Sequence, residues 1–184
     1  MEFMAVPTLV VVTGPAGSGK TSLAHQLALA IGCPAICRDE IKEGMAFGDD
    51  SFAPSVGDTL TKRTLPVFFD TLRLLLDSGV STVAEAAFQH HVWAPNLRPL
   101  MDLAAVRVIR CWTGPSVARE RVRHRASTRT AHADASVLDD ADYYDTYRWL
   151  QLEVPGTDVD TTAGYSPSIR DLVEWVTRHR AEHP

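Results

Sequence analysis

Cysteine is scarce in this sequence. Its 184 residues include only Cys33, Cys37 and Cys111, and an odd number of thiols cannot all pair within one chain. None of them has the spacing that is typical of a zinc site. We therefore expect reduced thiols, buried as small apolar side chains, and a cytoplasmic setting.

Long apolar runs and an excess of basic residues are also missing. No hydrophobic stretch is long enough to span a bilayer, and the first residues lack the pattern of a secretion signal, so we expect no membrane partner. The 23 acidic residues exceed the 18 basic ones and give a net charge of −5. Because nucleic-acid backbones are bound mainly through lysine and arginine, this balance disfavours a nucleic-acid partner. No repeat, low-complexity tract or linker divides the chain, which predicts one domain over residues 1–184.

The clearest motif is a glycine-rich loop at residues 14–21. Its sequence, GPAGSGKT, fits the pattern G-x-x-x-x-G-K-[ST] at every specified position. The glycines let successive backbone amides point inward at an oligophosphate, and the positive end of the following helix adds to the attraction. Lys20 is expected to reach the β- and γ-phosphates of ATP, and the Thr21 hydroxyl to bind Mg²⁺. The predicted nucleotide-binding residues are Gly14, Pro15, Ala16, Gly17, Ser18, Gly19, Lys20, Thr21 and Ser22.

The residues around this loop follow the order strand, loop, helix. Residues 9–13 form a short apolar run that is typical of a buried parallel strand, and apolar residues recur at helical spacing over 20–31. Further strands are expected near 34–37, 80–86, 106–112 and 154–162, and helices near 58–76, 93–104, 115–125, 142–150 and 166–176. Pro66 marks either the start or a kink of its helix, and Ser166 with Pro167 the cap of the last one. This alternation predicts an α/β P-loop NTPase fold, a five-stranded parallel sheet with helices on both faces and the site at the carboxyl ends of the strands.

Two acids and an arginine are candidates for the chemistry, because phosphoryl transfer needs positioning, Mg²⁺ and positive charge more than covalent help. Asp39 follows the second strand, where it is placed to orient or deprotonate an acceptor hydroxyl, or simply to cap the next helix. Glu85 ends an apolar strand, where its burial is costly without a partner. It is a candidate for Mg²⁺ or acceptor binding, or for a structural salt bridge. Arg38 is placed to contact the acceptor or a phosphate, or to pair with a surface carboxylate.

Arginines crowd the stretch after the fourth strand. On a helix, Arg121 and Arg125 share a face, and an arginine that closes over a triphosphate stabilises transition-state charge. These two are the predicted phosphate contacts, with Arg129 as a further candidate, whereas Arg119 and Arg123 are expected on a solvated face. Residues 114–141 are therefore predicted to form a mobile helical lid, with a polar loop over 126–140.

Together these landmarks resemble the small P-loop kinases. They are the loop, CRDEIKEG at 37–44, the acid after STV at 81–83, ARERVRHR at 118–125 and DVDTT at 158–162. The group includes chloramphenicol phosphotransferase, gluconate and shikimate kinases, zeta toxins, polynucleotide kinase-type domains and related AAA-type ATP-binding domains. The resemblance implies that Asp39 is the base or an acceptor contact, that Arg121 or Arg125 contacts phosphate, and that adenine lies near residues 161–164. The group often has Asp where this chain has Glu85.

The acceptor is expected in the segment 43–78, between the second and third strands. From residue 43 to 70 this segment carries five acids but only two bases, Lys62 and Arg63. A phosphorylated acceptor would need several cations there, so a neutral or cationic small molecule with a hydroxyl group is favoured, such as a nucleoside, an antibiotic or a sugar-like compound. Its candidate contacts are Arg38, Asp39, Arg63 and Glu85. A nucleotide or nucleic-acid end kinase and a regulatory NTPase without transferase activity stay open as alternatives, as does the oligomeric state.

Overall fold

Five parallel strands form the centre of the fold. The computed structural model describes residues 6–126, 131–132 and 134–178. Across the sheet the strand order is β2-β3-β1-β4-β5, and the strands are β1 (Thr8–Thr13), β2 (Ala35–Cys37), β3 (Thr82–Ala86), β4 (Ala105–Trp112) and β5 (Gly156–Asp160). The central strand, β1, pairs with β3 and β4, and its Val12 lies opposite Glu85 on one side and Ile109 on the other. The predicted α/β P-loop fold is confirmed.

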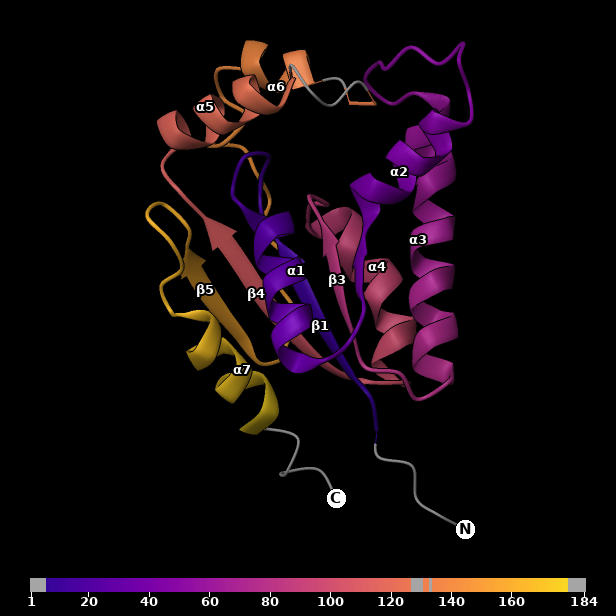
Figure 1. Cartoon of the computed structure of the whole chain (residues 1–184), viewed down its shortest axis with the longest axis vertical. Helices are drawn as coiled ribbons and strands as arrows, with labels where there is room; N and C mark the ends of the chain where they lie inside the picture. The colour runs from indigo at the N-terminus through magenta and orange to yellow at the C-terminus, as the bar shows by residue number, and fades with distance from the viewer. Residues whose placement is uncertain (1–5, 127–130, 133, 179–184) are drawn as a thin grey trace.

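Helices cover both faces of this sheet (Figure 1). One face carries α1 (Lys20–Ile31) and α7 (Ile169–Arg178), and the other carries α3 (Thr59–Asp77) and α4 (His90–Met101). Successive side chains of a strand point to opposite faces, so β1 feeds two cores. Val12 packs in the core that contains Leu27 and Leu172, whereas Val11 packs in the core that contains Phe68 and Trp93. No helix in the described residues combines the length and the apolar character needed to cross a bilayer.

Three more helices lie beyond the carboxyl ends of the strands. They are α2 (Arg38–Phe47), α5 (Pro115–Ala126) and α6 (Asp134–Asp139), and α5 and α6 stand above the sheet edge in Figure 1. The phosphate loop joins β1 to α1 at this same edge. Because parallel strands present all their carboxyl ends together, residues from distant parts of the chain meet here.

The main difference from the expected elements lies between residues 134 and 150. The predicted helix at 142–150 was wrong, since the chain forms turns there, and α6 lies inside the stretch that was expected to be a loop. Tyr143, Tyr144 and Tyr147 explain the turns, because their hydroxyls bond to backbone groups of Ala16 and Phe88. Tertiary hydrogen bonds here outweigh a weak local preference for helix.

Side-chain caps fix the starts of two helices. Helix α3 begins at Thr59, close to the expected position, because Asp58 caps it by accepting a hydrogen bond from the Thr61 amide at 2.7 Å. The helix continues through Pro66, so Pro66 does not mark its start. Helix α7 begins after Ser168, whose hydroxyl accepts a hydrogen bond from the Asp171 amide at 3.3 Å, so Ser166 is not its cap. In both cases the residue directly before the first turn satisfies an otherwise unpaired amide.

Candidate active site

The phosphate loop is held tightly by the elements around it. A side chain at Gly17 would clash with the carbonyl oxygen of Ala118 in α5, and Gly17 has a φ of +77° that favours glycine. At the base of the loop, the Thr161 hydroxyl donates a hydrogen bond to the carbonyl oxygen of Ser18 at 2.7 Å. The loop therefore depends on α5 and on the end of β5 for its shape.

Lys20 and Glu85 face one another at the centre of the site. The Lys20 ammonium lies 3.7 Å from a Glu85 carboxylate oxygen, and both side chains are almost fully buried. Burial raises the pKa of Glu85, Lys20 opposes this shift, and the nearby Asp39 adds to it. The nearby Thr21 hydroxyl and Cys37 thiol act to lower this pKa, yet neither carboxylate oxygen has a partner in good hydrogen-bonding geometry among the described residues. A buried carboxylate whose lone pairs are unmatched is a suitable ligand for a hard cation.

The residues present therefore fit Mg²⁺. Oxygen donors are the ligands that this ion prefers, and Thr21 and Glu85 supply a hydroxyl and a carboxylate beside the loop. The assignment of both as metal ligands stays a prediction.

Arg38 and Asp39 open α2 directly after β2. The Arg38 guanidinium donates to Asp39 Oδ1 at 2.9 Å and to the Thr61 carbonyl oxygen at 3.3 Å. Cys37 occupies the cap position of α2 and no side chain caps it, so Asp39 does not serve as the cap. Burial on its own would raise the pKa of Asp39, but the charges of Lys20, His132 and Arg38 together lower it to about 2. Asp39 is thus an ionised carboxylate close enough to Lys20 for the two charges to interact.

The stretch after α5 also reaches this corner. His132 Nε2 lies 3.0 Å from Glu43 Oε1 of α2, and His132 is close enough to influence the charge of Asp39. The stretch predicted as a lid is therefore connected to the helix that carries Asp39.

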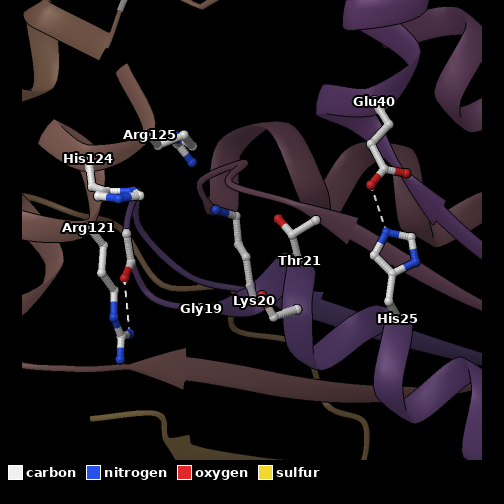
Figure 2. Close-up of a pocket in the computed structure, with 10 residues that line it drawn as sticks. Gly19, Lys20, Thr21, His25, Glu40, Arg121, His124 and Arg125 are labelled. Carbon is white, nitrogen blue, oxygen red and sulfur yellow. Dashed lines mark hydrogen bonds and ion pairs between the residues drawn. The ribbon is translucent and has the colours of Figure 1, made fainter. Parts of the chain in front are cut away.

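A cavity of about 500 Å³ opens beside the loop. Lys20, Thr21, His25, Arg121 and Arg125 are among the residues that line it. In the view of Figure 2, Arg125 extends from α5 toward the side where Lys20 lies. The volume of the cavity, and its lining of backbone amides and cations, suit the polyphosphate of a nucleotide.

The two lid arginines predicted to contact phosphate differ in their surroundings. Arg121 is occupied by protein oxygens: its guanidinium donates to Gly17, Thr161 and Thr162 at 2.7 to 3.3 Å. It also borders a second cavity, of about 350 Å³, together with Gly164 and Tyr165. This cavity lies near residues 161–164, the stretch where the resemblance to small P-loop kinases places adenine. Both arginines line the cavity beside the loop, and phosphate contact by either stays a prediction.

The other arginines lie away from the centre. Arg63 is exposed on the outer side of α3, where its charge acts on Asp49. Arg123 pairs with Glu120 on the surface, as expected. Arg129 lies outside the described residues. Of the four predicted acceptor contacts, the structure brings together Arg38, Asp39 and Glu85 but leaves Arg63 outside.

Sequence reasoning missed the residues that brace the loop. Arg119, expected on a solvated face, donates to the carbonyl oxygens of Leu138, Asp140 and Ala141 and lies over the ring of Tyr144 at 5.3 Å. The three carbonyl partners lie 19 to 22 residues from Arg119 in the sequence. No local pattern indicated them.

The fold and the loop define this chain as a P-loop NTPase, and its architecture matches that of the small P-loop kinases. The chain belongs to the AAA_33 family, described as an AAA domain, whose model matches residues 9–144. A comparison of the sequence with curated proteins found no match.

Solved structures are similar over almost the whole chain. A kinase candidate from Chloroflexus aurantiacus is 26% identical, with a TM-score of 0.83, and the match covers 95% of this chain and 98% of that one. A gluconokinase from Sinorhizobium meliloti is 20% identical, with a TM-score of 0.63, covering 97% and 95%. The APS kinase of Mycobacterium tuberculosis, in complex with AMPPNP and APS, is 16% identical, with a TM-score of 0.62, covering 96% and 97%. The latter two likenesses concern the fold.

Proposed function

We propose that this protein is an ATP-dependent phosphotransferase that moves the γ-phosphate of ATP to a hydroxyl group of a small, uncharged molecule. The observation that carries this proposal is the position of Asp39 near Lys20, close enough for the Lys20 charge to lower the pKa of Asp39. Lys20 belongs to the phosphate loop, whereas Asp39 is an ionised carboxylate on the opposite helix, with a pKa of about 2. A regulatory NTPase needs the first residue but has no use for the second.

The charges around Asp39 favour an acceptor without phosphate groups. The Arg38 guanidinium is bonded to Asp39, and Lys42 is bonded to Asp58 at 2.8 Å with both side chains buried. Each of these cations is thus neutralised by a carboxylate of the protein. A phosphorylated acceptor would have to displace such partners and leave buried carboxylates unpaired, at a high cost. A neutral hydroxyl compound can bind without breaking either pair.

The acceptor side also offers apolar surface and one unused donor. The Arg38 guanidinium lies over the ring of Phe88 at 5.8 Å, and Lys42 lies over the ring of Phe52 at 5.6 Å. The Arg38 Nε is buried and has no hydrogen-bond partner among the described residues. An oxygen atom of the acceptor would satisfy this donor, while the aromatic rings would cover its carbon skeleton.

In the proposed mechanism, the loop amides and Lys20 hold the triphosphate, and Arg125 approaches from α5 to stabilise charge on the transferred group. Mg²⁺ held by Thr21 and Glu85 would neutralise part of the phosphate charge. Asp39 accepts a hydrogen bond from the acceptor hydroxyl and aligns its oxygen with the γ-phosphorus. As the new bond from this oxygen to the γ-phosphorus forms, the bond from the γ-phosphorus to the β–γ bridging oxygen breaks, ADP leaves, and Asp39 takes the hydroxyl proton. A carboxylate with a low pKa is a weak base. It suffices because the transition state is loose and the proton leaves late.

A screen for ADP release tests this proposal. The protein is incubated with Mg²⁺, ATP and a panel of hydroxylated metabolites, nucleosides and antibiotics, and products are identified by the mass of one added phosphoryl group. We expect a neutral hydroxyl compound to accelerate ADP release with the wild type but not with Asp39→Asn. If a nucleoside monophosphate or a 5′-hydroxyl oligonucleotide is the best acceptor, the proposed acceptor class is wrong. If ATP binds and no acceptor accelerates its turnover, the protein is a regulatory NTPase.

A further inference from the structure

Three side chains of different chemistry converge beside the phosphate loop. His25 Nε2 lies 2.6 Å from Glu40 Oε1 and 3.6 Å from Cys37 Sγ. One donor atom from each of the three lies within 4.8 Å of the others. None of these side chains has a role in the proposed transfer reaction.

The fold brings these residues together from three elements. His25 follows Thr21 by one turn of α1, so both lie on the same helix face. Cys37 ends β2, and Glu40 lies in the first turn of α2. The spacing of the cysteines in the sequence indicated no metal site, because only one cysteine takes part and its partners come from neighbouring elements.

We infer that His25, Cys37 and Glu40 form a binding site for a borderline-soft divalent cation of the Zn²⁺ class. An imidazole nitrogen, a thiolate sulfur and a carboxylate oxygen are the donor types that Zn²⁺ combines in proteins, and three protein ligands leave one coordination position open. Mg²⁺ prefers oxygen donors alone, so the site is distinct in chemistry from Thr21 and Glu85.

Access and electrostatics both suit a cation. His25 and Glu40 line the cavity of about 500 Å³ and are about half exposed, so an ion can enter from the cavity (Figure 2). Cys37 is buried at the inner end of the cluster, close to Glu85 as well as Glu40. Glu85 is paired with Lys20, so Glu40 is the carboxylate beside the thiol and the imidazole whose charge a divalent ion would compensate.

A bound ion would connect the two halves of the active site. Its ligands would join α1, which carries Thr21, to the first turn of α2, which carries Asp39. A trace metal bound here would therefore hold α2, on the acceptor side, against α1, on the nucleotide side.

Titration of the nucleotide-free protein with Co²⁺, a spectroscopic substitute for Zn²⁺, tests this inference. We expect one Co²⁺ per chain, a near-ultraviolet charge-transfer band from the thiolate, and visible bands typical of tetrahedral cobalt, all abolished by an equivalent of Zn²⁺. Cys37→Ser should remove the charge-transfer band, whereas the matched control Cys33→Ser, at the more exposed thiol, should keep it. His25→Ala changes a half-exposed residue and should fold normally. It should weaken binding by at least the 10- to 100-fold that the loss of an outer-shell partner costs, roughly.

Mg²⁺ competition separates the two metal sites. Excess Mg²⁺ should leave the cobalt bands unchanged. The inference is wrong if wild-type protein gives no charge-transfer band, if the band survives Cys37→Ser, or if Mg²⁺ displaces the ion, since the ion would then lie at Thr21 and Glu85. Because nucleotide and acceptor are absent from these titrations, the outcome does not depend on the proposed transferase activity.

Discussion

The hydroxyl of Tyr144 donates a hydrogen bond to the carbonyl oxygen of Ala16 at 3.1 Å, across 128 residues of sequence. The neighbouring Tyr143 hydroxyl accepts from the Ala16 amide at 3.2 Å, so both polar groups of this loop residue are bonded to adjacent tyrosines. Arg119 lies over the Tyr144 ring and ties α5 to the end of α6. The phosphate loop is therefore braced by the segment that follows the predicted lid.

Tyr144→Phe tests this brace. Loss of one partly buried hydrogen bond should lower the free energy of unfolding by about 1 kcal/mol, and a less ordered loop should bind nucleotide more weakly because part of the binding energy is spent on ordering it. Urea unfolding and calorimetric titration with Mg²⁺–ATP measure the two effects. Unchanged affinity, with reduced stability, would show that the tyrosine supports the fold but not the loop's function.

Glu85→Gln should separate stability from activity. The pKa of Glu85 is raised because burial disfavours its charge and Lys20 only partly offsets this cost. An acid whose folded-state pKa is raised loses stability as the pH rises from its unfolded pKa through its folded pKa. A neutral glutamine cannot lose a proton, so the variant should lack this fall in stability with rising pH, although it also leaves the buried Lys20 without its partner carboxylate. Phosphoryl transfer should fall sharply through loss of the proposed metal ligand. Thermal unfolding at several pH values, together with ADP release, tests both expectations; a variant that keeps the pH dependence of the wild type and its full activity would contradict both.

The phosphate loop could be predicted from sequence because its chemistry is local. The glycines, Lys20 and Thr21 occupy one continuous stretch, and the strand before it and the helix after it have strong periodicity. Asp39 and Glu85 were found for a related reason, since both fall at or near the ends of parallel strands, and such ends share one edge of a sheet.

The supports of the site could not be predicted in this way. Thr161 and Arg121 bond to loop residues that lie 143 and 104 positions away in the sequence. A pattern within a short stretch of sequence cannot indicate contacts over such separations. The stretch around Tyr144 resembled a helix locally, but its aromatic hydroxyls bond to the loop instead. Packing between distant segments decided these positions.

Asp39→Asn should abolish turnover while leaving nucleotide affinity nearly intact, because the proposed partner of Asp39 is the acceptor hydroxyl and not the triphosphate. Its pKa is lowered from 3.8 to about 2, so its charge stabilises the fold above pH 3.8, and that contribution disappears as the pH falls toward 2. Wild-type protein should consequently lose more stability than the variant over this acid window. Stability measured between neutral pH and pH 2, with calorimetry and ADP release at neutral pH, provides the test. Unchanged turnover would eliminate Asp39 as base or orienting group.

Asp58→Ala should be strongly destabilising. Asp58 caps α3 and forms a buried pair with Lys42, and although burial alone would raise the pKa of Asp58, the hydrogen bonds from Lys42 and Thr61 lower it overall. Removing it leaves the buried Lys42 charge without a partner, for a loss of about 3 to 5 kcal/mol. Asp158→Ala is the matched control, since its pair with Arg110 is far more exposed than the pair of Asp58 with Lys42 and should contribute less than about 1 kcal/mol. If urea unfolding shows the same loss of unfolding free energy in both variants, the buried pair contributes no more to stability than the exposed one.

The substitutions Arg121→Ala and Arg125→Ala should affect different properties of the protein. Arg121 donates to oxygens of the loop and of the stretch after β5, so its loss should reduce stability by about 1 to 3 kcal/mol and raise the Kd for nucleotide. Arg125 lines the cavity beside Lys20, and its loss should lower kcat by about 100-fold, as is typical when one donor to transition-state charge is removed, with little change in Kd. Arg123→Ala, on the exposed side of α5, is the matched control and should alter neither. Thermal unfolding, nucleotide titration and steady-state kinetics on the three variants distinguish these roles. If Arg121→Ala lowers only kcat, or if Arg125→Ala lowers only the nucleotide affinity, then the roles assigned here to these two arginines are wrong.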